Sequence, residues 1–149
     1  MIGTGAHVAF ATEHFHPATP VQVAINGFGV GHRVRIVGVP SDHAHGFHVN
    51  LNTGSDTAFH FNPRFNEKCV VRNSTRHGAW QNEERYADTF PFHHGKIFTI
   101  EFVAHAGHIQ VFYNGQLFTQ FVEREDPHHI RVVEVAGDVH VHSIHVSSA

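Results

Sequence analysis

The sequence predicts an all-β protein, a two-sheet antiparallel β-sandwich with jelly-roll topology. Fourteen phenylalanines and many valines favour strands over helices. Roughly ten short strand-like segments are separated by turn signals about every eight to twelve residues, as in β-sandwiches. No segment keeps a helical period, and no internal repeat divides the chain. The 149 residues, 41% of them apolar, predict one domain over residues 1–149, with a short N-terminal extension over about 1–15.

In the first part of the chain, alternating apolar and polar residues mark the strands. The expected segments are 7–11, 21–25, 33–39 and 47–52. Asn26-Gly27 ends the second of these and Pro40 ends the third. The stretch GFGVG at 27–31 lacks the Lys and the Ser or Thr of a phosphate-binding P-loop, so we expect a turn there.

In the last part of the chain, strand formers are again interrupted by short turns. The expected segments are 96–103, 107–113, 116–122, 130–135 and 139–146. Asn114-Gly115 is the strongest hairpin signal in the sequence, and Gly137-Asp138 joins the last two segments in a similar way. Such short junctions favour antiparallel pairing of the two strands that each of them connects.

Residues 58–85, between these two parts, carry an unusual set of polar side chains. Alternate residues of a strand share a face, so His60, Asn62 and Arg64, here called the trio, point to one side. The neighbouring Phe59 would then face the core. Pro63 cannot donate to a β-ladder and is tolerated only at an edge, a strand end or a bulge, which predicts that the trio lies near the rim of a sheet.

The motifs HFNPRF, VVRNS and WQNEER follow one another in this stretch, and their order closely resembles the galectin signature HxNPR, VxN and WxxExR. The resemblance extends loosely over nearly the whole chain. It implies a non-enzymatic lectin that binds β-galactosides of the lactose and N-acetyllactosamine type. The seven signature positions, which the resemblance makes the carbohydrate-binding residues, are His60, Asn62, Arg64, Asn73, Trp80, Glu83 and Arg85.

The resemblance also implies a role for each of these residues. The trio would contact the axial 4-hydroxyl of galactose, Asn73 and Glu83 its 6-hydroxyl, and Trp80 its apolar face. Arg64, Glu83 and Arg85 would reach the next sugar. Only ten residues separate Asn62 from Asn73, fewer than in several galectins, so we expect an altered reach toward that sugar.

The chemistry of the side chains supports a sugar site independently. A galactoside offers C–H groups on one ring face and hydroxyls at its edge, which suits a flat indole beside convergent polar groups. Arg64 and Arg85 only donate hydrogen bonds, ionised Glu83 only accepts them, and amides and neutral imidazole do both. We expect Glu83 to stay ionised and orient both arginines. If His60 must accept a hydrogen bond, affinity should fall as it protonates between pH 7.5 and about 5.5.

Composition limits the partners and the compartment. With a formal net charge of -3 and ten Lys and Arg, the chain predicts no nucleic-acid binding, and no apolar run is long enough for membrane insertion. One cysteine, Cys69, excludes an internal disulfide framework and favours a reducing compartment. The N-terminal sequence shows no signal peptide. The resemblance implies a cytoplasmic protein that can be exported without one, binds glycans on glycoproteins or glycolipids, and can form a homodimer through a sandwich edge.

The same sequence also bears on other classes of function. Eighteen histidines suggest metal binding, but neither HExxH nor a CxxC pair is present, so we expect no metal and no cofactor. A glycoside hydrolase needs two opposed carboxylates, one of them protonated, and arginines should keep Glu83 ionised. Nucleophilic catalysis by Cys69 lacks partners that spacing could tie to it. A galectin-like domain used for protein contacts remains an alternative.

Overall fold

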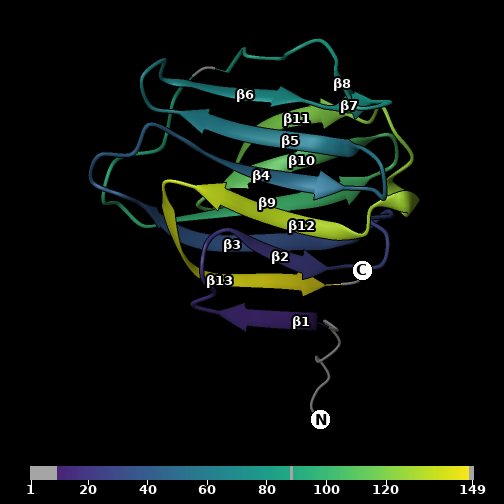
Figure 1. The fold of residues 1–149 in the computed structure, drawn as a ribbon, viewed down its shortest axis with the longest axis horizontal. Helices are drawn as coiled ribbons and strands as arrows, with labels where there is room; N and C mark the ends of the chain where they lie inside the picture. Colours follow the sequence, from purple (N-terminus) through teal and green to yellow (C-terminus); the bar gives the residue numbers. More distant parts are fainter. Residues whose placement is uncertain (1–9, 88, 148–149) are drawn as a thin grey trace.

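The computed structural model describes residues 10–87 and 89–147. These residues form two antiparallel sheets packed face to face (Figure 1), which confirms the predicted fold class. The six-stranded sheet contains, in spatial order, β1 (Phe10–Phe15), β13 (Val139–Ser147), β3 (Arg33–Pro40), β9 (Phe98–His105), β10 (His108–Tyr113) and β11 (Gln116–Val122). The five-stranded sheet contains β2 (Val21–Ala24), β12 (Val132–Gly137), β4 (Phe47–Asn52), β5 (Thr57–Arg64) and β6 (Cys69–Asn73).

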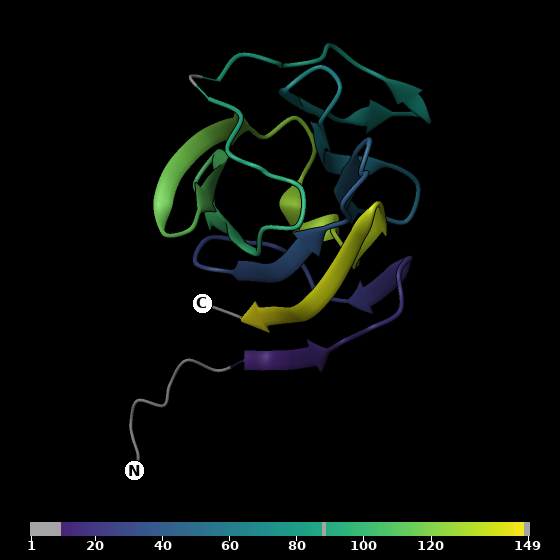
Figure 2. The ribbon, with the colours of Figure 1, turned by 90° about the vertical axis from the view of Figure 1, so that its left-hand side faces the viewer.

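Two smaller elements complete the fold. A two-stranded ribbon, β7 (Thr75–Arg76) and β8 (Ala79–Trp80), follows β6 and was not among the expected strands. One 3-10 turn, η1 (Pro127–His129), precedes β12 and is capped by the side chain of Asp126. The long connection from β8 to β9 crosses the top of the sandwich (Figures 1 and 2).

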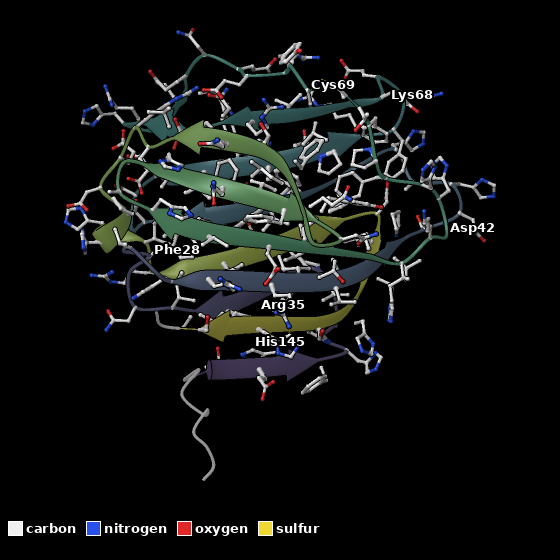
Figure 3. All side chains as sticks on the ribbon, turned by 180° about the vertical axis from the view of Figure 1, so that it is seen from behind. Phe28, Arg35, Asp42, Lys68, Cys69 and His145 are labelled. Atoms are coloured by element: carbon white, nitrogen blue, oxygen red, sulfur yellow. The ribbon has the colours of Figure 1, made fainter. Side chains whose placement is uncertain are left out.

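Phenylalanine rings fill the space between the sheets. Phe47 of β4 stacks on Phe98 of β9 with 5.3 Å between ring centroids, and Phe59 of β5 meets Phe102 of β9 edge to face at 5.1 Å. All four rings are buried. The outer face of the six-stranded sheet is polar instead, and Figure 3 shows Arg35 and His145 on it.

The structure corrects two expectations about where parts of the chain lie. The N-terminal extension was expected to cover about 1–15, but Phe10–Phe15 form β1 and pair with β13, while residues 1–9 lie outside the described residues. The trio was expected near the rim of a sheet, yet β5 is an inner strand between β4 and β6. Pro63 is accommodated because it lies one residue from the end of β5, so the trio occupies the open face of the sheet.

Candidate functional site

Strand β5 places the trio on its outer face because the residues that alternate with the trio point into the core. Phe59 and Phe61 are fully buried beneath the sheet, whereas the trio residues are half-buried above it. Asn62 is fixed at both ends of its amide: Nδ2 donates to the Phe47 carbonyl at 2.7 Å, and Oδ1 accepts from Arg64 Nε at 2.8 Å. The trio is therefore already ordered without a ligand.

Trp80 stands beside the trio as an exposed ring. Its indole is 55% exposed, and its centroid lies 4.7 Å from that of the His60 imidazole. The β7–β8 turn that presents it is held by Asp56, whose carboxylate accepts from Gly78 N and Thr75 Oγ1, each at 2.8 Å. These bonds, the Gly78 amide first, lower the pKa of Asp56. The turn is thereby anchored to the loop between β4 and β5.

Arg64 and Arg85 form a closed ring of ion pairs with two carboxylates, Glu67 and Glu83. These four residues are here called the charge ring. Glu83 lies 2.8 Å from Arg85 Nε and 3.7 Å from Arg64 Nη2, as the sequence led us to expect. Glu67 completes the ring at 2.9 Å from Arg85 Nη1 and 3.1 Å from Arg64 Nη1. Bonds from Arg85 and then Arg64 lower the pKa of Glu67, and Glu67 and Glu83 raise the pKa of Arg85. Each pair is exposed and weak singly, but the ring orients both guanidinium groups.

Glu67 was missed by sequence reasoning, which considered only the length of the loop between β5 and β6. The signal was present, because Glu67 follows Arg64 by three residues, and a carboxylate on a turn this tight can fold back onto the preceding guanidinium. Figure 3 marks the position of this turn by Lys68 and Cys69.

Asn73 lies at the bottom of the site and is 3% exposed. Its Oδ1 accepts from Ser74 N at 2.8 Å and from Arg124 Nη1 at 3.0 Å, while Nδ2 donates to the Gln81 carbonyl at 3.0 Å. One amide hydrogen is therefore left for a ligand. Six of the seven predicted residues meet at the surface around Trp80, and the seventh supports them from below.

Two arginines that the sequence did not assign hold the segment after Trp80. Arg124 donates to the Asn82 carbonyl at 2.8 Å and to Glu84 Oε2 at 3.0 Å. Buried Arg72, 3% exposed, donates to the Val70 and Tyr86 carbonyls at 2.8 and 2.7 Å. These bonds place Glu83 and Arg85 opposite the end of β5.

The imidazole of His60 is half-buried, and its Nδ1 lies 2.6 Å from Asn50 Oδ1. Burial lowers its pKa to about 4, with His48 and Arg64 acting in the same direction and Asn62 and Glu83 against it. His60 is therefore neutral at physiological pH and can both give and accept a hydrogen bond.

The described residues were also compared with the arrangements that metal binding and membrane crossing require. Among residues 10–87 and 89–147, no three or more His, Cys, Asp or Glu side chains are arranged to hold a metal ion. Within the same ranges, no helix is long and apolar enough to cross a membrane. Both carboxylates of the site are bridged by arginines.

Chemically, the arrangement suits a ligand that has both a carbon face and many hydroxyls. An exposed indole can cover a carbon face, and donors and acceptors such as those of the trio and the two ion-paired arginines can pair with hydroxyls. Fold and site together are those of a lectin, a protein that binds carbohydrate without converting it.

Comparison with known proteins identifies the family of lectins to which the chain belongs. The family model described as galactoside-binding lectin matches residues 20–146. The chain therefore belongs to the galectin family of galactoside-binding lectins, as its signature motifs suggested. Members of this family are carbohydrate-binding proteins and not enzymes.

Individual relatives agree with this placement. The crystal structure of Caenorhabditis elegans galectin LEC-6 is 46% identical and superimposes with a TM-score of 0.88 over 95% of this chain and 99% of that one. The 32 kDa beta-galactoside-binding lectin of Caenorhabditis elegans is 37% identical over 89% of this chain and 47% of its own length. Mouse galectin-7 is 37% identical over 80% of this chain and 90% of its own. The chain thus spans about half the length of the first of the curated relatives it matches.

Proposed function

We propose that this protein is a non-enzymatic lectin that binds β-galactosides of the lactose and N-acetyllactosamine type. The observation that carries the proposal is the exposed indole of Trp80 standing 4.7 Å from His60, above side chains already ordered by hydrogen bonds. A galactose ring would lay its C–H face on the indole. Its axial 4-hydroxyl would meet the trio, and its 6-hydroxyl would meet Asn73 and Glu83.

The second sugar would lie against the charge ring of Arg64, Glu67, Glu83 and Arg85. Because both carboxylates hold the guanidinium groups in place, little side-chain freedom would be lost on binding. Glucose, whose 4-hydroxyl is equatorial, would leave trio donors and acceptors unmet. An unmet partly buried group costs about 1–3 kcal/mol, so galactose should be preferred roughly 5- to 150-fold.

Calorimetry with lactose tests this function directly. We expect binding heat from the wild-type protein with lactose and none with maltose. Trp80→Ala and Arg64→Ala should each abolish lactose binding while the fold stays intact, since both side chains are solvent-facing. Phe15→Ala is the matched control, because Phe15 is an equally exposed ring on the other sheet, 61% exposed, and should bind as wild type.

Two results would contradict the proposal. One is a folded wild-type protein that gives no heat with lactose; the other is lactose binding retained by folded Trp80→Ala. Protein that ignores lactose yet captures a protein partner through this face would instead favour a protein-contact domain.

We further propose that two copies pair into a homodimer that crosslinks glycans on glycoproteins or glycolipids. The outermost strands β1 and β2 lie at the same end of the sandwich, away from β8, the strand that contains Trp80 (Figure 1). Pairing there would leave both sugar sites open, and avidity would raise the effective affinity by about 10²–10⁴. Sedimentation velocity should show a dimer; a monomer at all concentrations would contradict this arrangement.

The compartment is also a proposal. A galectin with one cysteine and no disulfide requirement suits synthesis in the cytoplasm followed by export without a signal peptide. Fractionation of cells and medium, with antibody to the native protein, should find it in both.

A further inference from the structure

A single row of polar side chains crosses the five-stranded sheet and ends at the sugar site. Gln22, Glu134, Asn50 and His60 are in register on β2, β12, β4 and β5. Gln22 Nε2 donates to Glu134 Oε2 at 3.3 Å, and Asn50 Nδ2 donates to Glu134 Oε1 at 3.1 Å. Asn50 Oδ1 then lies 2.6 Å from His60 Nδ1. None of the first three belongs to the galactoside signature.

The carboxylate of Glu134 decides which way the Asn50 amide points. An ionised carboxylate only accepts hydrogen bonds, so the amide must present its NH₂ group to Glu134. The reverse orientation would set two acceptor oxygens against each other at about 3 Å and leave the amide hydrogens toward the ring. Asn50 is 8% exposed, so water cannot readily relieve such a mismatch.

The orientation of the amide in turn decides the tautomer of His60. With Asn50 Oδ1 facing the ring at 2.6 Å, Nδ1 must carry the proton and donate it. Nε2 is then left bare as an acceptor. Asn62 also acts on the ring as a hydrogen-bond acceptor, but a neutral imidazole carries a single ring proton, and the 2.6 Å contact to Asn50 Oδ1 places that proton on Nδ1.

The groups that face His60 keep the ring neutral, so the tautomer matters at working pH. His48 of β4, whose ring centroid is 5.6 Å away, and Arg64 of β5 both oppose a positive charge on it. Glu83 acts in the opposite direction and more weakly than these two. Burial is the largest influence and also disfavours the charged form.

We propose that Asn50 and Glu134 are positioning residues of the galactoside site, which hold His60 as the Nδ1–H tautomer and keep Nε2 ready to accept a sugar hydroxyl. The part played by the sugar rests on the proposed function. The tautomer does not, because it is set in the protein before any ligand binds.

Nitrogen NMR of the His60 ring, assigned by comparison with His60→Gln, reads the tautomer directly. Wild type should show a protonated Nδ1 and a bare Nε2. Glu134→Lys should reverse this, because an ammonium group only donates and would turn the Asn50 amide round. Asn50→Leu should lose the preference. The double variant Asn50→Asp with Glu134→Gln should keep Nδ1–H, because the glutamine amide can donate to one carboxylate oxygen while the other accepts from Nδ1. Glu13→Lys, the same charge change on the opposite sheet, is the control.

Lactose affinity should follow the tautomer. We expect about a tenfold loss for Glu134→Lys and Asn50→Leu, the effect of one misdirected hydrogen bond. The double variant Asn50→Asp with Glu134→Gln should stay within about threefold of wild type at pH 7.5 but lose affinity at a higher pH than wild type, because a carboxylate beside Nδ1 favours the charged ring. A merely structural role for Asn50 would not produce this rescue.

Either of two results overturns the proposal: a wild-type ring protonated on Nε2, or an unchanged Nδ1–H ring in folded Glu134→Lys and Asn50→Leu. Thermal unfolding verifies that each variant is folded. A wild-type protein with the Nδ1–H ring that binds no lactose would instead refute the galactoside function and leave the tautomer assignment standing.

Discussion

The protonation of His60 in the folded protein differs from that of an isolated histidine side chain. Its ordinary titration predicts that lactose affinity falls between pH 7.5 and about 5.5. The fold moves its pKa to about 4, because burial first and then the positive fields of His48 and Arg64 oppose protonation. The lower pKa moves the pH range expected for this loss of affinity downward, and the sequence could not indicate this because it does not show which residues of other strands lie beside His60.

We predict that lactose affinity is constant from pH 7.5 to about 5.5 and falls as the pH approaches 4. The sign follows from the acceptor role: the neutral ring binds, and protonation removes the lone pair that the sugar uses. Calorimetric titrations at half-unit pH steps measure this. A midpoint near 6.5 would mean that His60 titrates as an exposed imidazole and that its burial has no effect.

Strand β6 shows how a buried charge can serve a site that it does not touch. Arg72 pairs its backbone with Glu84 at 2.8 and 2.9 Å and sends its guanidinium to the Val70 and Tyr86 carbonyls. The segment that carries Glu83 and Arg85 is thereby fastened to the edge of the sheet. The position was given no role from sequence, since a lone arginine in an apolar run carries no pattern.

We predict that Arg72→Ala lowers the free energy of unfolding by about 2–4 kcal/mol, because the buried Val70 carbonyl and the Tyr86 carbonyl both lose a charged donor. It should also weaken lactose binding several-fold by loosening Arg85. Urea denaturation and calorimetry measure the two effects. Arg76→Ala, which removes a more exposed guanidinium from the pair with Glu125, is the control and should cost at most about 1 kcal/mol. If both variants lost the same free energy of unfolding, Arg72 would not anchor the segment that carries Glu83 and Arg85.

The sandwich as a whole depends on aromatic contacts between its sheets. Phe47 is buried, stacks on Phe98 across the interior and meets Phe92 edge to face at 5.6 Å. Its backbone carbonyl also receives the amide of Asn62. One residue therefore joins the core to the sugar site.

We predict that Phe47→Ala lowers the free energy of unfolding by about 3–5 kcal/mol, the usual cost of removing a buried ring and leaving a cavity. Exposed Phe15→Ala should change it by no more than about 0.5 kcal/mol. Urea denaturation followed by far-UV circular dichroism compares them. A small effect at Phe47 would show that the two sheets do not depend on this contact.

Most of the strands and their inward and outward faces could be predicted from sequence, whereas the binding role of the seven signature residues stays a prediction. Alternation along β5 is a property of the strand itself, so Phe59 inside and His60 outside follow without any partner. The ribbon β7–β8 was not predicted, because strands of two residues are too short to show alternation.

Tertiary structure alone decided which distant residues serve the site. Asn50 contacts His60, and Glu134 contacts Asn50, because β12, β4 and β5 pair in one register, and a shift of one residue would turn these side chains to the other face. Arg124 meets Asn73 across 51 positions of sequence. The local sequence pattern determines which side chains of one strand share a face. Burial, pKa values and hydrogen bonds between strands depend instead on which strands become neighbours, and this is decided only when the sheets assemble.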